Sequence, residues 1–439
     1  MLLSLAQLLL QGRHPEHPVC HTLHGTLRWR EFSDRLGRLI AYLYADARQR
    51  WLLANDDAEV FVLWLLALLA AGKQIVIPPN FQPGTLEQLA IRCDATAGNV
   101  DIGTLPLTSA MAENIAAASI ELYTSGSSGE SKCIIKTPDQ LEREVSTLEA
   151  QWGATTGAAS VVATVPHHHI YGLLFRLLWP LAAGRPFDTV QCIHPDTLQQ
   201  RIALLGDTVL VASPAQLARM PQLIELEKIA PWPRRVFSSG GPLPLRAAEA
   251  LRGHCGSAPI EVYGSTETGG MAWRDQTEGE WWTPFPGIAL ESETNGALVH
   301  SPFLAPNIAH RLGDAIELSQ DGRFKLLGRT DRIVKVEEKR LSLPDMEYRM
   351  QEHPWVAQAA AVLLSGVRQS IGMAVALTAE GKTALTLRGR QDMRAQLREH
   401  LAQYFDAVLL PRYWRYLDAL PYTPQGKLPA AALLTLFAE

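Results

Sequence analysis

The sequence is short of the features that mark nucleic-acid-binding and disulfide-rich proteins. Its formal net charge is −5, with 40 Lys and Arg against 45 Asp and Glu, so no overall positive charge attracts nucleic acid or an anionic membrane. The five cysteines are scattered and form no C-x-x-C pair: Cys20, Cys93, Cys133, Cys192 and Cys255. An odd, scattered set argues against a disulfide framework or a zinc site and favours a reducing compartment, the cytoplasm.

Long apolar runs are also lacking. The run from Val60 to Gly72, VFVLWLLALLAAG, is shorter than the roughly 20 residues that a membrane-spanning helix needs, and we expect a buried helix there. The first segment, MLLSLAQLLLQG, has no basic residue before its apolar stretch and no A-x-A type cleavage site. This favours a docked amphipathic helix over a signal peptide. We therefore expect no transmembrane segment.

The middle of the chain predicts an α/β fold. Short β-rich runs alternate with helix-sized stretches, in the order AASVVATVP, DTVLVAS, RRVFSSGG and PIEVYG. This alternation predicts parallel strands with crossover helices, and ligands of such sheets lie beyond the carboxyl ends of the strands. No fixed-period repeat or low-complexity tract is present, which excludes a solenoid.

The pattern changes toward the C-terminus, which predicts a second domain. Residues 287–328 show shorter alternating runs with a hairpin turn at Asp321-Gly322, as in a small barrel-like subdomain. After the charged run RTDRIVKVEEKR, strand and helix patterns resume with VAQAAAVLL, MAVALTA, RQDMRAQLREHLAQYF and a short final helix. We place the domain boundary near Asp331, which gives an N-terminal domain of residues 1–329 and a C-terminal α+β domain of residues 330–439.

The segment ELYTSGSSGESKCIIKT, from Glu121 to Thr137, predicts a phosphate cradle. Glycines let backbone N–H groups approach an oxyanion, the hydroxyls add donors, and Lys132 adds a full charge. The segment is not a Walker A loop, because Gly126 and Gly129 are too close together and no G-K-[ST] follows. A flexible Gly/Ser surface loop is the alternative.

Residues 123–132 resemble the phosphate loop of the adenylate-forming superfamily, which includes acyl-CoA and acyl-carrier-protein synthetases, peptide-synthetase adenylation domains and luciferases. The signature reads approximately Y-T-S-G-[ST]-T-G-x-P-K, and here Ser128 replaces the usual Thr and Ser131 the usual Pro. Further motifs of the superfamily follow in order. The resemblance implies that the triphosphate of ATP is bound by Thr124, Ser125, Gly126, Ser127, Ser128, Gly129 and Lys132.

Two further segments resemble the superfamily's adenine pocket and magnesium ligand, FSSGGPLP and EVYGSTETGG. A carboxylate suits a hard cation that bridges phosphates. A strand ending in a polar turn would explain the glycines but not the full set. The resemblance implies an adenine site at Gly240, Gly241, Tyr263 and Gly264, an α-phosphate contact from Thr266, and Mg²⁺ binding by Glu267.

The segment VPHHHIYG resembles the superfamily's P-x-x-H-x-x-G, which lines the acid pocket. A metal site is the alternative for the three adjacent histidines, but neighbours in a strand point to opposite faces and cannot all reach one ion. The resemblance implies an acid pocket formed by His169, Tyr171, Ser239 and Met271.

The last motifs concern the ribose, the hinge and the catalytic lysine. AHRLGDAIELSQDGRFKLLGRTDRIVK resembles Y-R-T-G-D and G-R-x-D-x-x-x-K, although His310 and Leu312 replace the usual Tyr and Thr. The resemblance implies that Asp314 accepts the two ribose hydroxyls, Arg329 approaches the ribose, and Asp331 is the hinge of a mobile C-terminal domain. LPYTPQGKLP matches P-x-T-x-x-G-K, which makes Lys427 the lysine that stabilises the charge of the transition state.

The resemblance implies a two-step ligase. ATP and Mg²⁺ would activate an aryl or fatty acid to an acyl-adenylate, which then passes to a phosphopantetheine thiol. We expect an acyl carrier protein as the acceptor, since no basic cluster that could clasp the phosphates of free CoA is obvious; CoA is the alternative. Glu338 stands at the usual glycine of K-x-x-G-x-R-I, where it would border the pantetheine tunnel. A non-catalytic nucleotide-binding regulator and a luciferase-like oxygenase are alternatives of other classes.

Overall fold

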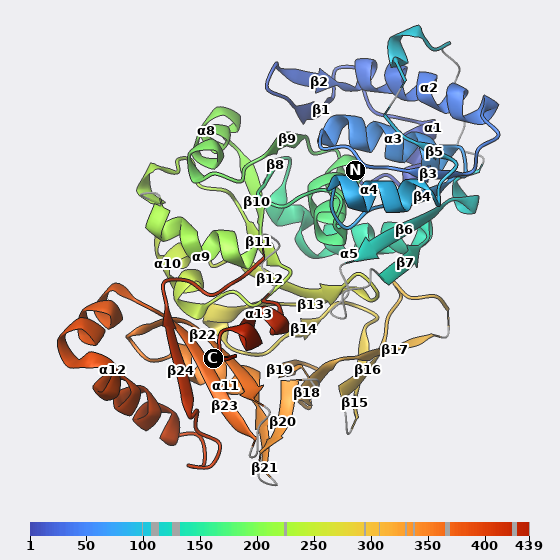
Figure 1. The fold of residues 1–439 in the computed structure, drawn as a ribbon. Coiled ribbons are helices and arrows are strands. Elements are labelled where there is room, and N and C mark those ends of the chain that lie inside the picture. Colours follow the sequence, from blue (N-terminus) through green and yellow to red (C-terminus); the bar gives the residue numbers. More distant parts are fainter. Residues whose placement is uncertain are drawn as a thin grey trace. The chain divides into compact units, whose positions relative to one another are not determined.

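The protein is described here by a computed structural model (Figure 1). The described residues are 1–98, 100–106, 114–124, 132–223, 226–293, 296–306, 308–329, 332–336, 339–364, 369–423 and 428–438. They divide into two compact units, residues 1–288 with 300–309, and residues 289–299 with 310–439. Both units mix helices and sheets, which confirms the predicted α/β class.

The first unit contains a large sheet. Its strands are β1 (Pro18–His21), β2 (Thr26–Arg28), β8 (Ser160–Ala163), β9 (Phe187–Gln191), β10 (Thr208–Ala212), β11 (Val236–Ser239), β12 (Ile260–Ser265), β13 (Gly269–Asp275) and β14 (Thr283–Pro284). They lie in the order β14-β13-β12-β11-β10-β8-β9-β1-β2. The neighbours from β8 through β12 are parallel, which confirms the predicted alternation of strands and crossover helices.

A second sheet of the same unit ends at the predicted phosphate loop. Its strands are β3 (Arg50–Leu52), β4 (Gln74–Ile77), β5 (Ala95–Thr96), β6 (Ser119–Thr124) and β7 (Lys132–Lys136). Their order is β5-β3-β4-β6-β7. All pairs are parallel except β6 with β7, so β7 returns antiparallel along the edge of the sheet.

Helices connect many of the strands of these two sheets. The α-helices are α1 (Leu5–Leu10), α2 (Trp29–Ala45), α3 (Ala58–Ala70), α4 (Pro83–Ala90), α5 (Pro138–Thr156), α6 (Ile170–Gly172), α7 (Trp179–Ala183), α8 (Pro195–Leu205), α9 (Pro214–Leu223) and α10 (Leu245–Cys255). The shorter 3₁₀ turns are η1 (Ile102–Thr104), η2 (Ile115–Ala117), η4 (Leu226–Lys228) and η5 (Gln276–Glu278), and η3 (Leu173–Leu178) is a π-helix.

Helix α3 is the centre of the core. The Asp57 carboxylate caps its first turn by accepting hydrogen bonds from the amides of Glu59 and Val60, which satisfies donors that a helix N-terminus leaves open. The helix contacts β4 of one sheet and β9 of the other, and every residue from Phe61 to Ala70 is buried. The apolar run therefore forms the predicted buried helix, between two sheets.

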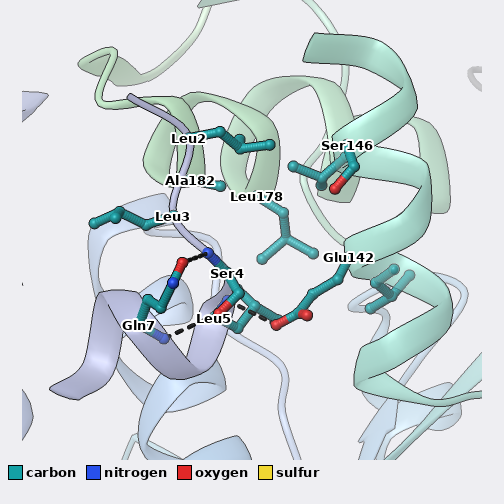
Figure 2. Close-up of a pocket in the computed structure, with 11 residues that line it drawn as sticks. Leu2, Leu3, Ser4, Leu5, Gln7, Glu142, Ser146, Leu178 and Ala182 are labelled. Atoms are coloured by element: carbon teal, nitrogen blue, oxygen red, sulfur yellow. Dashed lines mark hydrogen bonds between the residues drawn. The ribbon is translucent and has the colours of Figure 1, made fainter. Parts of the chain in front are cut away.

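Helix α1 is docked, as predicted from the first segment. Ser4 and Gln7 form a capping box at its start, and Leu5, Leu8 and Leu9 are buried. Figure 2 shows the Glu142 carboxylate of α5, which accepts a 2.7 Å hydrogen bond from the Leu5 amide. Among the described residues no helix is long and apolar enough to span a membrane.

The described residues of the second unit form small sheets. Its strands are β15 (Ala289–Glu293), β16 (Gly296–His300), β17 (Ala309–Leu312), β18 (Asp314–Leu318), β19 (Phe324–Arg329), β20 (Ile333–Val336), β21 (Lys339–Ser342), β22 (Val356–Leu364), β23 (Ser370–Leu377) and β24 (Tyr413–Leu417). They group as β15-β16-β17, β18-β19, β20-β21 and β22-β23-β24. The hairpin predicted at Asp321-Gly322 joins β18 to β19, and Gly322 has the positive φ of 83° that such a turn favours.

The helices of the second unit are α11 (Leu343–Gln351), α12 (Ala379–Ala402) and α13 (Ala430–Thr435). Helix α12 contains most of the predicted helical run, which extends three residues beyond its end, but begins earlier, and Gly389, with φ 80°, interrupts it. Strand β24, the short run YWRYL, was not predicted from the sequence, and it pairs parallel with β23. The second unit already includes residues 289–299 and 310–329; a hinge and mobile domain beginning near Asp331 stay a prediction.

Candidate functional site

The predicted phosphate loop lies between β6 and β7. These strands pair antiparallel with Thr124 opposite Lys132, and the Thr124 hydroxyl donates to the Lys132 carbonyl oxygen at 3.4 Å. The strand ends thus bring the first and last residues of the loop together. The other residues predicted for the triphosphate lie outside the described residues: Ser125, Gly126, Ser127, Ser128 and Gly129.

Lys132 and Glu267 meet at the edge of this loop. The Lys132 ammonium donates to Glu267 Oε1 at 2.8 Å, with the Lys132 side chain 59% exposed and that of Glu267 24% exposed. Burial alone would raise the pKa of Glu267, but the hydrogen bond and charge of Lys132 bring that pKa below its usual value. Glu267 is therefore held as a carboxylate beside a cation from a segment far away in the sequence.

The turn between β12 and β13 carries Thr266 and Glu267. The buried Thr268 hydroxyl accepts a 3.2 Å hydrogen bond from the Ser265 amide and lies 3.1 Å from the Ser265 hydroxyl. Ser301 Oγ donates to the Thr268 carbonyl at 3.5 Å. These contacts fix the backbone of the turn and leave the half-buried Thr266 and Glu267 side chains at the end of a strand in the large sheet.

Close backbone approach explains two glycines of this turn. A Cβ added at Gly264 would lie 2.2 Å from the Gly269 carbonyl oxygen, and one added at Gly269 would lie 2.5 Å from the Glu144 carboxylate. Gly264 therefore has a structural reason to be glycine, besides the predicted contact with the nucleotide.

Gly240 and Gly241 follow β11 and leave space around their backbone. Gly240 has φ +95°, which favours glycine, and a Cβ there would meet no atom within 4 Å. At Gly241 the nearest atom, of Pro214, is 4.0 Å away. Open backbone at the carboxyl end of a parallel strand is compatible with the predicted adenine site.

Three other predicted residues already make contacts within the fold. The Tyr263 ring packs on Trp282 with centroids 5.5 Å apart. The Ser239 hydroxyl donates to the Val262 carbonyl at 2.8 Å, and Met271 is buried in β13. Their predicted roles toward adenine and the acid stay predictions.

The three histidines lie in a turn after β8, so the expectation that they are neighbours in a strand was wrong. The His167 Nε2 atom lies 2.8 Å from the Asn55 carbonyl oxygen, and the His168 ring packs on Phe81 with centroids 4.3 Å apart. His169 stands before α6, its ring centroid 4.4 Å from that of His168. The three imidazole rings therefore differ in the groups that they contact.

Tyr171 follows in α6, and its hydroxyl donates to the Ala212 carbonyl oxygen at 3.3 Å. Burial raises the pKa of Tyr171 well above its usual value, so the phenol stays protonated and keeps this hydrogen bond. The contact ties α6 to the end of β10. A role for Tyr171 in the acid pocket stays a prediction.

The predicted ribose residues are opposite each other in the second unit. Asp314 begins β18 and Arg329 ends β19, and the antiparallel register pairs them directly. Two distant motif positions therefore become cross-strand neighbours. Asp331, Glu338 and Lys427 lie outside the described residues.

Lys136 and Glu144 were missed by the sequence reasoning, although they support the Glu267 turn. Both side chains are buried, with 1% and 3% exposure, and their charged atoms lie 3.9 Å apart. Two signals could have indicated them. Lys136 ends an apolar strand, and Glu144 lies three residues after Leu141 on the core-facing side of α5.

The donor set suits magnesium better than a transition metal. Glu267 brings one carboxylate to the predicted site, beside the Lys132 ammonium. Mg²⁺ fits such a site, because it is usually held by one or two carboxylates together with phosphate oxygens and water.

The pocket in Figure 2 is separate from the predicted site. Its volume is about 250 Å³, and its walls come from the first residues of the chain, α5, η3 and α7. None of the residues predicted for ATP or the acid lines it.

Part of the chain matches a known protein family. A family model described as AMP-binding enzyme matches residues 108–292. The chain is 28% identical over 305 residues to the 4-coumarate–CoA ligase of Rhodobacter capsulatus, covering 69% of this chain and 73% of that protein. It is 30% identical over 273 residues to the 4-coumarate–CoA ligase of Cereibacter sphaeroides, covering 61% and 59%.

Among solved structures, ATP-bound MatB from Rhodopseudomonas palustris has the same fold. It aligns with a TM-score of 0.81 and 19% identity over 100% of this chain and 99% of that one. At this identity the likeness concerns the fold, a large N-terminal and a small C-terminal domain. The matched segment 108–292 includes Lys132, Gly240 and Glu267, so three of the motifs that carry the resemblance lie within the AMP-binding match.

Proposed function

We propose that the protein joins a carboxylic acid to a phosphopantetheine thiol in two steps that consume ATP and leave AMP and pyrophosphate. The observation that carries the proposal is the 2.8 Å contact of Lys132 with Glu267, which joins two motifs within the AMP-binding match. A cation beside a single carboxylate, next to a loop rich in glycine and hydroxyl groups, suits a triphosphate with its metal ion.

In the first step, a carboxylate oxygen attacks the α-phosphorus, the bond from that phosphorus to the bridging oxygen breaks, and pyrophosphate leaves. Negative charge builds on the phosphate oxygens. Lys132 and the loop donors would stabilise it on the leaving group, Thr266 would contact the α-phosphate, and Lys427 would add its charge. Mg²⁺, held by Glu267, would neutralise phosphate charge.

In the second step, a thiolate attacks the acyl carbon and AMP leaves, which forms a thioester without any redox change. Between the two steps, the C-terminal domain would rotate about Asp331. This rotation would take Lys427 away from the reacting atoms and bring the tunnel for the thiol to them. Glu338 would border that tunnel.

We propose an aryl or fatty acid as the substrate. An aryl acid is favoured by the two relatives named 4-coumarate–CoA ligases. The acceptor is a phosphopantetheine thiol, of a carrier protein as the sequence leads us to expect, or of CoA, which the names of the same relatives favour.

The test is exchange of labelled pyrophosphate into ATP across a panel of aryl and fatty acids. At least one acid should support exchange, and adding either CoA or a phosphopantetheinylated carrier protein should then release AMP and form a thioester with one of them. If no acid supports exchange although the protein binds ATP, the non-catalytic nucleotide-binding alternative replaces the ligase.

A further inference from the structure

Strand β7 presents two lysines on one side, because residues four apart in a strand point the same way. Lys132 reaches the Glu267 carboxylate from the solvent, whereas Lys136 is 1% exposed and approaches the same residue from beneath. The Lys136 ammonium donates to the Glu267 carbonyl oxygen at 3.0 Å and to the Phe303 carbonyl oxygen at 3.3 Å. Glu267 is thus contacted by both lysines, once on its side chain and once on its backbone.

Glu144 completes the contact from helix α5. Its carboxylate lies 3.9 Å from the Lys136 ammonium and accepts a 3.0 Å hydrogen bond from the Gly270 amide. Gly269 has φ +72°, and a Cβ there would lie 2.5 Å from the Glu144 carboxylate. The carboxylate therefore fills the space beside the glycines, and the buried pair holds the turn on both sides of Thr268.

A buried ion pair is weak support for stability as such, since desolvation of the two charges can cancel their attraction. Both side chains are almost fully buried, with 1% and 3% exposure, so their surroundings penalise both charges. Apolar residues would fill this part of the core at lower cost. Because the pair contacts the backbone at Glu267, positioning of that residue explains the pair better than stability does.

We propose that Lys136 and Glu144 are positioning residues, which fix the Ser265–Gly269 turn in the place from which the Glu267 carboxylate meets Mg²⁺ and ATP. The inference rests on the proposed function and adds two residues to it. Groups that orient a metal ligand typically change metal affinity by about 10- to 100-fold when they are removed.

The readout is the affinity for ATP measured by calorimetry with Mg²⁺ and with EDTA, which needs neither the acid nor turnover. For the unaltered protein we expect tighter binding with Mg²⁺. In Lys136→Met this gain from Mg²⁺ should shrink by about tenfold, while binding in EDTA changes little. Lys136→Met leaves Glu144 buried without its cation, which destabilises the fold. The double variant Lys136→Met with Glu144→Gln, which removes both charges of the pair, is therefore measured beside it.

Lys73 supplies the matched control. It is also a buried lysine of the first unit, 4% exposed, and its ammonium donates to the Asp46 carbonyl oxygen at 2.7 Å. Lys73→Met should lower thermal stability but keep the full gain from Mg²⁺. The inference is overturned if the double variant keeps the gain, or if Lys73→Met loses as much of it. An unaltered protein that does not bind ATP at all would instead overturn the proposed function.

Discussion

The Lys132 ammonium lies 2.8 Å from Glu267 Oε1, which joins the edge strand β7 to the β12–β13 turn. Because the lysine of this ion pair is largely exposed to solvent, the pair contributes about 0–1 kcal/mol to the free energy of unfolding. We expect Glu267→Gln to leave the melting temperature nearly unchanged and to abolish the gain in ATP affinity from Mg²⁺, because an amide brings no charge to the metal.

The matched control for this change is Asp207→Asn, which removes the carboxylate of another exposed ion pair of the first unit, with Arg234. It should change neither melting temperature nor the response to Mg²⁺. Retention of the Mg²⁺ effect in Glu267→Gln would remove Glu267 from the metal site.

Gly264 should not tolerate alanine. The added Cβ would lie 2.2 Å from the Gly269 carbonyl oxygen, so the two strands would have to separate, at a cost of about 1–3 kcal/mol. Gly253→Ala, in helix α10 with no atom within 4 Å of the new Cβ, should instead stabilise by about 0.5–1 kcal/mol. Chemical denaturation of both variants decides this; equal effects would mean that the close approach is not as described.

Acid should destabilise the first unit through its histidines. Burial, with the charge of Arg176 as a smaller cause, lowers the pKa of His167 to about 3, and burial and the neighbouring histidines lower that of His168 to about 2. Below pH 6.5 these histidines bind protons in the unfolded chain but not in the folded chain. The free energy of unfolding is therefore highest above pH 6.5 and decreases as the pH falls. The loss is up to about 1.4 kcal/mol per pH unit for each histidine.

His168→Phe tests this. The change removes the titrating group and keeps a ring against Phe81, so the loss of stability between pH 6.5 and 5 should be smaller than in the unaltered protein. The same change at the exposed His24 should leave the slope as it was. An unchanged slope in His168→Phe would show that His168 is not kept neutral by the fold.

Much of the fold followed from sequence because local patterns decided it. The apolar run from Val60 to Gly72 was expected to be buried, and the parallel strands β8, β10, β11 and β12 were visible as β-rich runs, whereas β9 was not predicted. Pairing of distant residues could not be read in this way. Strand β24 is a short run whose partner β23 is fixed by tertiary packing, and the link of Lys136 to Glu144 and Glu267 depends on how a strand, a helix and a turn meet.

Asp314 offers a test of the ribose site. Asp314→Ala removes the carboxylate that is expected to accept the ribose hydroxyls. ATP binding should weaken by about tenfold or more, since hydrogen bonds to a charged group contribute about 1.5–3 kcal/mol. The control is 2′,3′-dideoxy-ATP, which lacks both hydroxyls. It should bind the variant as well as ATP does, whereas the unaltered protein should prefer ATP. If the variant still prefers ATP, the hydroxyls are bound elsewhere.

The central claim is that the chain forms an acyl-adenylate with Lys427 as the catalytic lysine. Its most direct test is acid-dependent exchange of labelled pyrophosphate into ATP by the unaltered protein and by Lys427→Ala, with ATP binding measured for both. We predict exchange with at least one aryl or fatty acid, a loss of about 10²- to 10³-fold in Lys427→Ala, and unchanged ATP binding. Exchange that is as fast in Lys427→Ala as in the unaltered protein, or absent from both with every acid, would contradict the account.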